Sequence, residues 1–147
     1  MEHIISMEKS NFNKVREFHE VFGLSVRDSF DSDNPYNGDY PLRIKLIREE
    51  YEELMEAFEE GNYENIAKEM ADLLYVVYGT GVTMGIDLDK ALDIVHDSNM
   101  SKLDDNGKPI YNSYGKVQKS DNYYPANLSE LLDGTRKDNR TTSETGE

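Results

Sequence analysis

Two stretches decide the fold of this chain: residues 41–60, PLRIKLIREEYEELMEAFEE, and residues 63–84, YENIAKEMADLLYVVYGTGVTM. In both stretches apolar residues recur at the spacing of an amphipathic helix, and a glycine directly follows. Pro41 suits the first turn of the one helix, and Gly61 and Gly85 suit the position after a helix end. The sequence therefore predicts two long helices with a very short connection between them.

Two shorter helices are predicted on either side of this pair. One covers about residues 11–22, where Ser10 or Asn11 can act as the N-cap and phenylalanines recur at helical spacing. The other covers about residues 88–103, with Asp87 as its N-cap. We therefore expect an all-α fold, a bundle of four main helices.

The remaining segments have weaker patterns. Residues 28–41 are rich in Asp, Asn, Ser, Gly and Pro, so we expect an irregular loop there. After the fourth helix, short alternating stretches around Ile110 and Val117 predict a weak hairpin or an extended, irregular excursion. Residues 128–132 can add one or two helical turns. None of these segments indicates a second domain.

Length and composition limit the possible functions. A chain of 147 residues suits one domain, which we assign to residues 1–132, because residues 133–147 contain almost nothing apolar and are expected to be a disordered tail. The chain has no cysteine, no apolar run typical of a signal peptide or a membrane span, and a formal net charge of −14. We expect a cytoplasmic protein with no membrane and no nucleic-acid partner. An acidic protein can still bind a nucleoside triphosphate when divalent cations lie between the two.

Several carboxylates fall on helix faces that the apolar residues mark as buried. In the two long helices these are Glu49, Glu50, Glu53, Glu69 and Asp72, with Glu49 at the edge of its face. Lys68 is expected to point the other way, and Arg43 is the one cation on the corresponding face of its helix. Burying an unpaired carboxylate costs on the order of several kcal/mol, so converging acids need cations. Oxygen ligands without cysteine or a well-placed histidine favour Mg²⁺, with Mn²⁺ as a substitute, over zinc.

The second long helix also predicts a partner. Residues 73–85, LLYVVYGTGVTMG, carry no charge and are apolar nearly all round. A helix with this composition is normally covered on all sides. We therefore expect a second copy of the chain to cover part of it.

The acidic positions form two motifs. Glu49-Glu50-x-x-Glu53 is followed, after fifteen residues, by Glu69-x-x-Asp72. This pattern resembles the EExxE and ExxD motifs of the MazG-like superfamily of all-α nucleoside triphosphate pyrophosphohydrolases, which also contains phosphoribosyl-ATP pyrophosphohydrolase and the dimeric dUTPases. The resemblance covers roughly residues 18–103, and FHEVFGL, LRIKLIREEYEELMEA and SNMSKLDDNGKPIY resemble segments of phage and bacterial members.

The resemblance implies a role for each acid. Four of them would ligate Mg²⁺: Glu50, Glu53, Glu69 and Asp72. Glu49 would bind a further Mg²⁺ or act as the general base that orients the attacking water, although its edge position also suits a surface salt bridge. The implied reaction is attack of metal-activated water on the α-phosphorus of a nucleoside triphosphate, giving the monophosphate and pyrophosphate. The implied assembly is a homodimer or a tetramer.

Candidates for binding the substrate come mainly from the fourth helix. MazG-like proteins are similar in placing Asn and Lys there, which points to Asn99 and Lys102 as phosphate ligands. Near a helix end, these two residues can also serve as a cap and as a partner of the helix dipole. Arg43 is a weaker candidate, equally suited to pairing with the acids. An aromatic wall for the base is expected from Phe18 and Phe22 or from a neighbouring subunit.

The motifs leave the substrate open. Our first expectation is house-cleaning or remodelling of the nucleotide pool, with a preference for purine triphosphates such as dGTP. Hydrolysis of phosphoribosyl-ATP or dUTP shares the same metal site and stays an alternative, as does a non-catalytic helical module that binds cation and nucleotide. A carboxylate-bridged di-iron protein is not expected, because neither Glu50 nor Glu69 begins a Glu-x-x-His motif.

Overall fold

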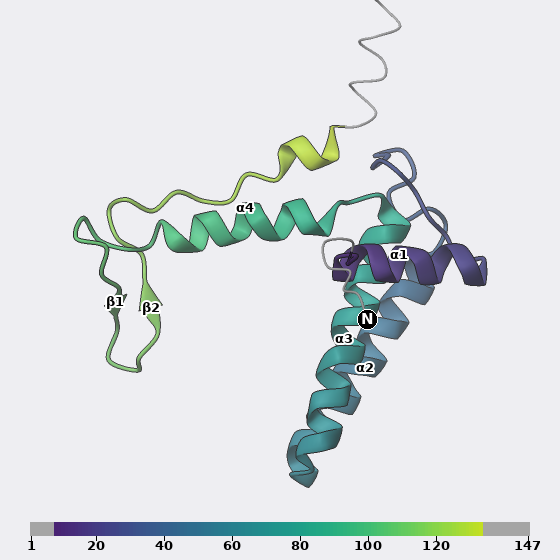
Figure 1. The fold of residues 1–147 in the computed structure, drawn as a ribbon, viewed down its shortest axis with the longest axis horizontal. Helices are drawn as coiled ribbons and strands as arrows, with labels where there is room; N and C mark the ends of the chain where they lie inside the picture. Colours follow the sequence, from purple (N-terminus) through teal and green to yellow (C-terminus); the bar gives the residue numbers. More distant parts are fainter. Residues whose placement is uncertain (1–7, 134–147) are drawn as a thin grey trace, which may run out of the picture.

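Four main helices carry the fold in the computed structural model, which describes residues 8–133 (Figure 1). α2 (Tyr40–Glu60) and α3 (Tyr63–Met84) lie side by side as a long antiparallel pair. α1 (Asn11–Phe22) crosses the upper part of this pair and packs against α3. α4 (Leu88–Met100) extends away from the pair as an arm. The predicted all-α class with four main helices is confirmed.

Local capping interactions set the ends of these helices. The Ser10 side chain accepts a hydrogen bond from a first-turn amide of α1, and Asp87 does the same for α4. Gly61 ends α2 with a φ of 70°, and the next residue, Asn62, caps α3 through its side chain. Because only Gly61 and Asn62 connect the two helices, α3 folds back along α2.

Two small apolar clusters hold the helices together. One joins α1 to the last turns of α3 and includes Val15 and Val82. The other joins α2 to the first turns of α3 through Leu54, Ala57 and Ile66. Between the two clusters, the contact between α2 and α3 contains the acidic side chains described below.

The arm begins as predicted but ends early. α4 finishes at Met100, three residues before the predicted end, because the chain turns where the Ser101 hydroxyl donates to the Ser98 carbonyl at 2.6 Å. The hydroxyl of Ser98 itself donates to the Tyr124 carbonyl at 2.8 Å. This bond ties the returning chain to the last turns of α4.

A small hairpin lies at the far end of the arm. β1 (Ile110–Tyr111) and β2 (Val117–Gln118) pair in antiparallel orientation, and the chain then runs back along α4 to the 3₁₀ helix η1 (Ser129–Leu132). The predicted hairpin and final helical turn are thus confirmed. The predicted disordered tail lies, except for Asp133, outside the described residues.

Apolar side chains remain exposed on all four main helices of the protomer. On α3 and α4 they include Leu74, Tyr75, Val77, Leu92 and Met100. The second copy expected against α3 stays a prediction. Within residues 8–133, no helix combines the length and the apolar character needed to cross a membrane.

Candidate metal centre

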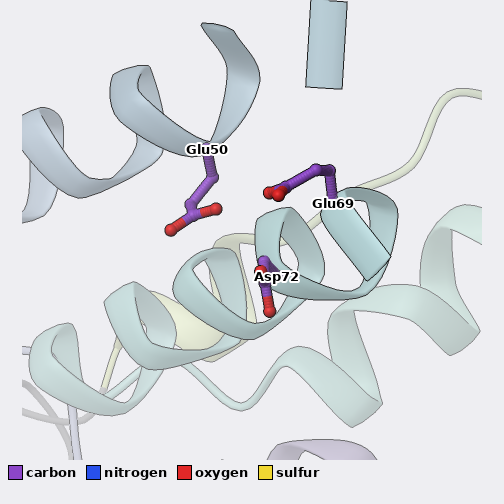
Figure 2. A group of neighbouring side chains, drawn as sticks. All are labelled: Glu50, Glu69 and Asp72. Carbon is purple, nitrogen blue, oxygen red and sulfur yellow. The ribbon is translucent and has the colours of Figure 1, made fainter. Parts of the chain in front are cut away.

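Three of the predicted acids meet between α2 and α3. Figure 2 shows the Glu50 side chain reaching from α2 toward Glu69 and Asp72 on α3. One carboxylate oxygen from each of the three lies within 4.8 Å of the others. Glu69 and Asp72 are three residues apart, so they stand one above the other on neighbouring turns of the same helix. Two separate stretches of sequence therefore supply one cluster of oxygen atoms.

Burial makes this cluster unusual for acidic side chains. Glu69 is only 6% exposed. Within the described residues, Glu50 Oε2 and Glu69 Oε2 are buried and accept no hydrogen bond. Buried polar atoms are nearly always paired, so unpaired carboxylate oxygens indicate a missing partner. Hard oxygen donors that lack a partner fit Mg²⁺ or Mn²⁺.

Burial and repulsion between the neighbouring acids raise the pKa values of Glu50 and Glu53. Burial, with repulsion from Glu53, Asp72 and Glu69, raises the pKa of Glu50 from 4.5 to about 7. A hydrogen bond to Glu69 and repulsion from it raise the pKa of Glu53. Both shifts disfavour the ionised carboxylates, and a divalent cation would reverse them.

The other two predicted acids lie at the margin. Glu53 is exposed and is not among the three residues whose oxygens converge. Glu49 is also exposed and lies 3.8 Å from Lys45 Nζ, as an i,i+4 pair. The predicted roles of Glu53 as a ligand and Glu49 as a base or second-metal ligand stay predictions.

Lys68 does not point away from the cluster, so that prediction is wrong. Its Nζ lies 2.7 Å from Asp72 Oδ2 and 3.5 Å from Glu69 Oε1. Helical projection gives the direction of Cβ, whereas a four-carbon side chain can curve along the helix to a residue one turn away. The i,i+4 spacing of Lys68 and Asp72 was the sequence feature that could have revealed the contact.

Arg43 is placed as a structural residue. It is 4% exposed, and its guanidinium donates to the Val76 carbonyl at 2.9 Å and to Thr80 Oγ1 at 3.2 Å. These bonds join α2 to α3 above the acid cluster. The position supports neither the predicted phosphate contact nor the alternative of pairing with the clustered acids.

Asn99 and Lys102 lie at the far end of α4, which leads away from α2 and α3 (Figure 1). They line a pocket together with Leu103 and Pro109. Within one protomer, therefore, the structure does not bring these residues to the acids. Their predicted role as phosphate ligands stays a prediction.

The helical fold and the acids of two motifs, gathered between neighbouring helices, define the class: an all-α protein of the MazG-like type. Comparison with known proteins then identifies the family. Residues 15–99 match the phosphoribosyl-ATP pyrophosphohydrolase family, and the chain belongs to it, within the MazG-like superfamily. The expected superfamily is thus confirmed, and membership implies a nucleotide pyrophosphohydrolase.

One viral protein is similar over much of the chain. An uncharacterized protein of Acanthamoeba polyphaga mimivirus is 33% identical over an alignment of 119 positions that covers 78% of this chain and 44% of that protein. The chain thus spans less than half the length of this relative. Because the viral relative is itself uncharacterized, the substrate is argued from the site.

Proposed function

We propose that this protein hydrolyses (deoxy)nucleoside triphosphates between the α- and β-phosphates, in a Mg²⁺-dependent reaction that yields the monophosphate and pyrophosphate. The observation that carries the proposal is the convergence of Glu50, Glu69 and Asp72, with two buried oxygens that accept no hydrogen bond among the described residues. A chain of the phosphoribosyl-ATP pyrophosphohydrolase family that gathers such donors is equipped to hold a hard cation.

Each acid has a distinct part in this proposal. Glu50, Glu69 and Asp72 would hold the cation, and Glu53 would complete the ligands from the open side. When bound, Mg²⁺ supplies an acidified water and neutralises charge on the triphosphate. Glu49, exposed and 3.8 Å from Lys45 Nζ, would leave that ion pair to orient the water and accept its proton.

The base would lie against aromatic rings. Phe18 of α1 contacts Tyr75 of α3 edge-on, with ring centroids 5.6 Å apart, and Phe22 lies 4.4 Å from Phe18. Tyr75 is one helical turn beyond Asp72, so these rings border the acids. A broad aromatic surface suits a purine, and dGTP is our first choice of substrate, in a house-cleaning or pool-remodelling role. Phosphoribosyl-ATP and dUTP are the alternatives.

Assembly would complete the site. We place the exposed apolar residues of α3 and α4 in the interface of a homodimer or tetramer. Asn99 and Lys102, carried away from their own acids on α4, would then contact a triphosphate held by a neighbouring subunit. A cytoplasmic location, with access to the nucleotide pool, completes the proposal.

Product analysis across a substrate panel tests this function. Purified protein is given each NTP and dNTP, together with phosphoribosyl-ATP, in Mg²⁺ and in EDTA, and monophosphate and pyrophosphate are quantified. We expect metal-dependent formation of both products, its loss in Glu50→Gln and Asp72→Asn, and its retention in the control Glu52→Gln on the exposed side of α2. Nucleotide binding without turnover across the panel would instead favour a non-catalytic cation- and nucleotide-binding module.

A further inference from the structure

Lys68 is the base that pairs with the metal-binding acids in the described part of the chain. Its ammonium lies 2.7 Å from Asp72 Oδ2 and 3.5 Å from Glu69 Oε1. Among the ion pairs within residues 8–133, no other Lys, Arg or His contacts Glu50, Glu53, Glu69 or Asp72. We propose that Lys68 is an internal counter-cation of the metal-free site, and that its positive charge opposes the binding of a divalent ion. The inference rests on the proposed metal-binding function.

The two kinds of cation compete for the same two carboxylate groups, those of Asp72 and Glu69. A carboxylate oxygen that ligates Mg²⁺ or Mn²⁺ lies about 2.1 Å from the ion, which leaves no room for an ammonium on the same side of that oxygen. Asp72 Oδ2 now accepts its hydrogen bond from Lys68, and Glu69 Oε1 faces the same ammonium. A divalent ion held by Asp72 and Glu69 therefore repels the Lys68 ammonium, and it displaces the ammonium from any oxygen that becomes a ligand, whereas Glu69 Oε2 has no hydrogen-bond partner among the described residues.

Lys68 can move without disturbing the fold. Its side chain is 65% exposed, whereas the Glu69 carboxyl it approaches is buried. An ammonium on a flexible four-carbon stem is readily hydrated once it swings into solvent. The displaced group nevertheless stays tethered to α3, one residue from Glu69. It remains at the rim of the site, where the phosphates of a metal-bound nucleotide would offer it new oxygen partners.

This arrangement makes metal and nucleotide binding favour each other. Free metal alone binds against the repulsion of Lys68 with no compensation, because a repelled ammonium gains only water. A metal ion that arrives with a triphosphate also brings acceptors for the displaced ammonium. The coupling is reciprocal, so the residue lowers the affinity for free ion and favours the metal–nucleotide complex.

Direct binding of Mn²⁺ alone to the full chain tests the inference. Dissociation constants are measured by calorimetry and by electron paramagnetic resonance of free Mn²⁺, at low salt and without nucleotide. Lys68→Met removes the competing charge. Lys90→Met makes the same charge change on an exposed residue in the first turn of α4, and Lys68→Arg keeps the positive charge.

We expect Lys68→Met to bind Mn²⁺ about 3- to 10-fold more tightly than Lys90→Met, since an exposed charge pair and a nearby like charge are each a modest effect. Lys68→Arg should stay within about threefold of the wild type, by the same reasoning. Equal affinities of the two Met variants, or weaker binding by Lys68→Met, would overturn the inference while leaving the metal site intact. Absence of Mn²⁺ binding in every protein, wild type included, would overturn the proposed function and this inference together.

Discussion

Replacing Glu50 by Gln should make the metal-free protein more stable. The folded protein raises the pKa of this carboxyl from 4.5 to about 7, so at pH 8 its ionised form opposes folding. At 1.36 kcal/mol for each tenfold change in proton affinity, the full shift has an upper bound of about 3 kcal/mol, which solvent screening of this incompletely buried carboxyl reduces. A neutral amide of the same shape removes this penalty but is itself partly buried, so we expect a net gain of about 1–2 kcal/mol.

Thermal denaturation in EDTA at pH 8 measures this gain. Glu52→Gln is the matched control, because it removes the same charge from an exposed position on the same helix and thereby accounts for the general effect of a net charge of −14. Relative to that control, Glu50→Gln should raise the melting temperature by about 2–6 °C. Saturating Mg²⁺ should reverse the order, since only the wild type gains full binding energy from the ion. A Glu50→Gln protein no more stable than Glu52→Gln in EDTA would refute the claim that the acids are strained without metal.

Three further outcomes follow from the same structure. In EDTA, the free energy of unfolding of the wild type relative to Glu50→Gln should fall as the pH rises from about 4.5 to 7. In that range folded Glu50 keeps a proton that the unfolded chain has lost. If the difference between the two denaturation midpoints does not change with pH, the pKa of about 7 is contradicted. Gly79→Ala should lower the free energy of unfolding, measured in urea, by about 1–3 kcal/mol. A Cβ at this position would lie 2.5 Å from Arg43 Nη2 and 2.9 Å from His19 Nε2, in a buried hydrogen-bonded site. A neutral or stabilising effect would mean that these two side chains move aside freely. Deleting residues 134–147 should leave pyrophosphate release unchanged, and a large loss would show that this segment contributes to the site or the assembly.

The helix ends were predictable from sequence because each is set by neighbouring residues. Ser10, Asp87 and Gly61 act where their local chemistry indicated. The early end of α4 was not predictable in this way, since it depends on a turn at Ser101 and on the return segment beyond the hairpin. Capping is encoded within a few residues, whereas that turn involves contacts across twenty or more.

The clustered acids were predictable because they break the rule that charged residues avoid apolar helix faces. Glu50, Glu69 and Asp72 came together as the helical periodicity required. The helical periodicity does not show how far a long side chain reaches or which atoms of a neighbouring helix it contacts. Lys68 curves back toward the acids, and Arg43 donates to a backbone carbonyl and a threonine hydroxyl of α3 that no pattern in the sequence reveals.

The position of water attack tests the central claim most directly. Hydrolysis of the best substrate in ¹⁸O-labelled water and Mg²⁺, followed by mass spectrometry of both products, identifies the phosphorus that receives the new oxygen. Attack at the α-phosphorus predicts one ¹⁸O in the nucleoside monophosphate and none in the pyrophosphate. Label in the pyrophosphate, or release of inorganic phosphate with the diphosphate left behind, would contradict the proposed reaction.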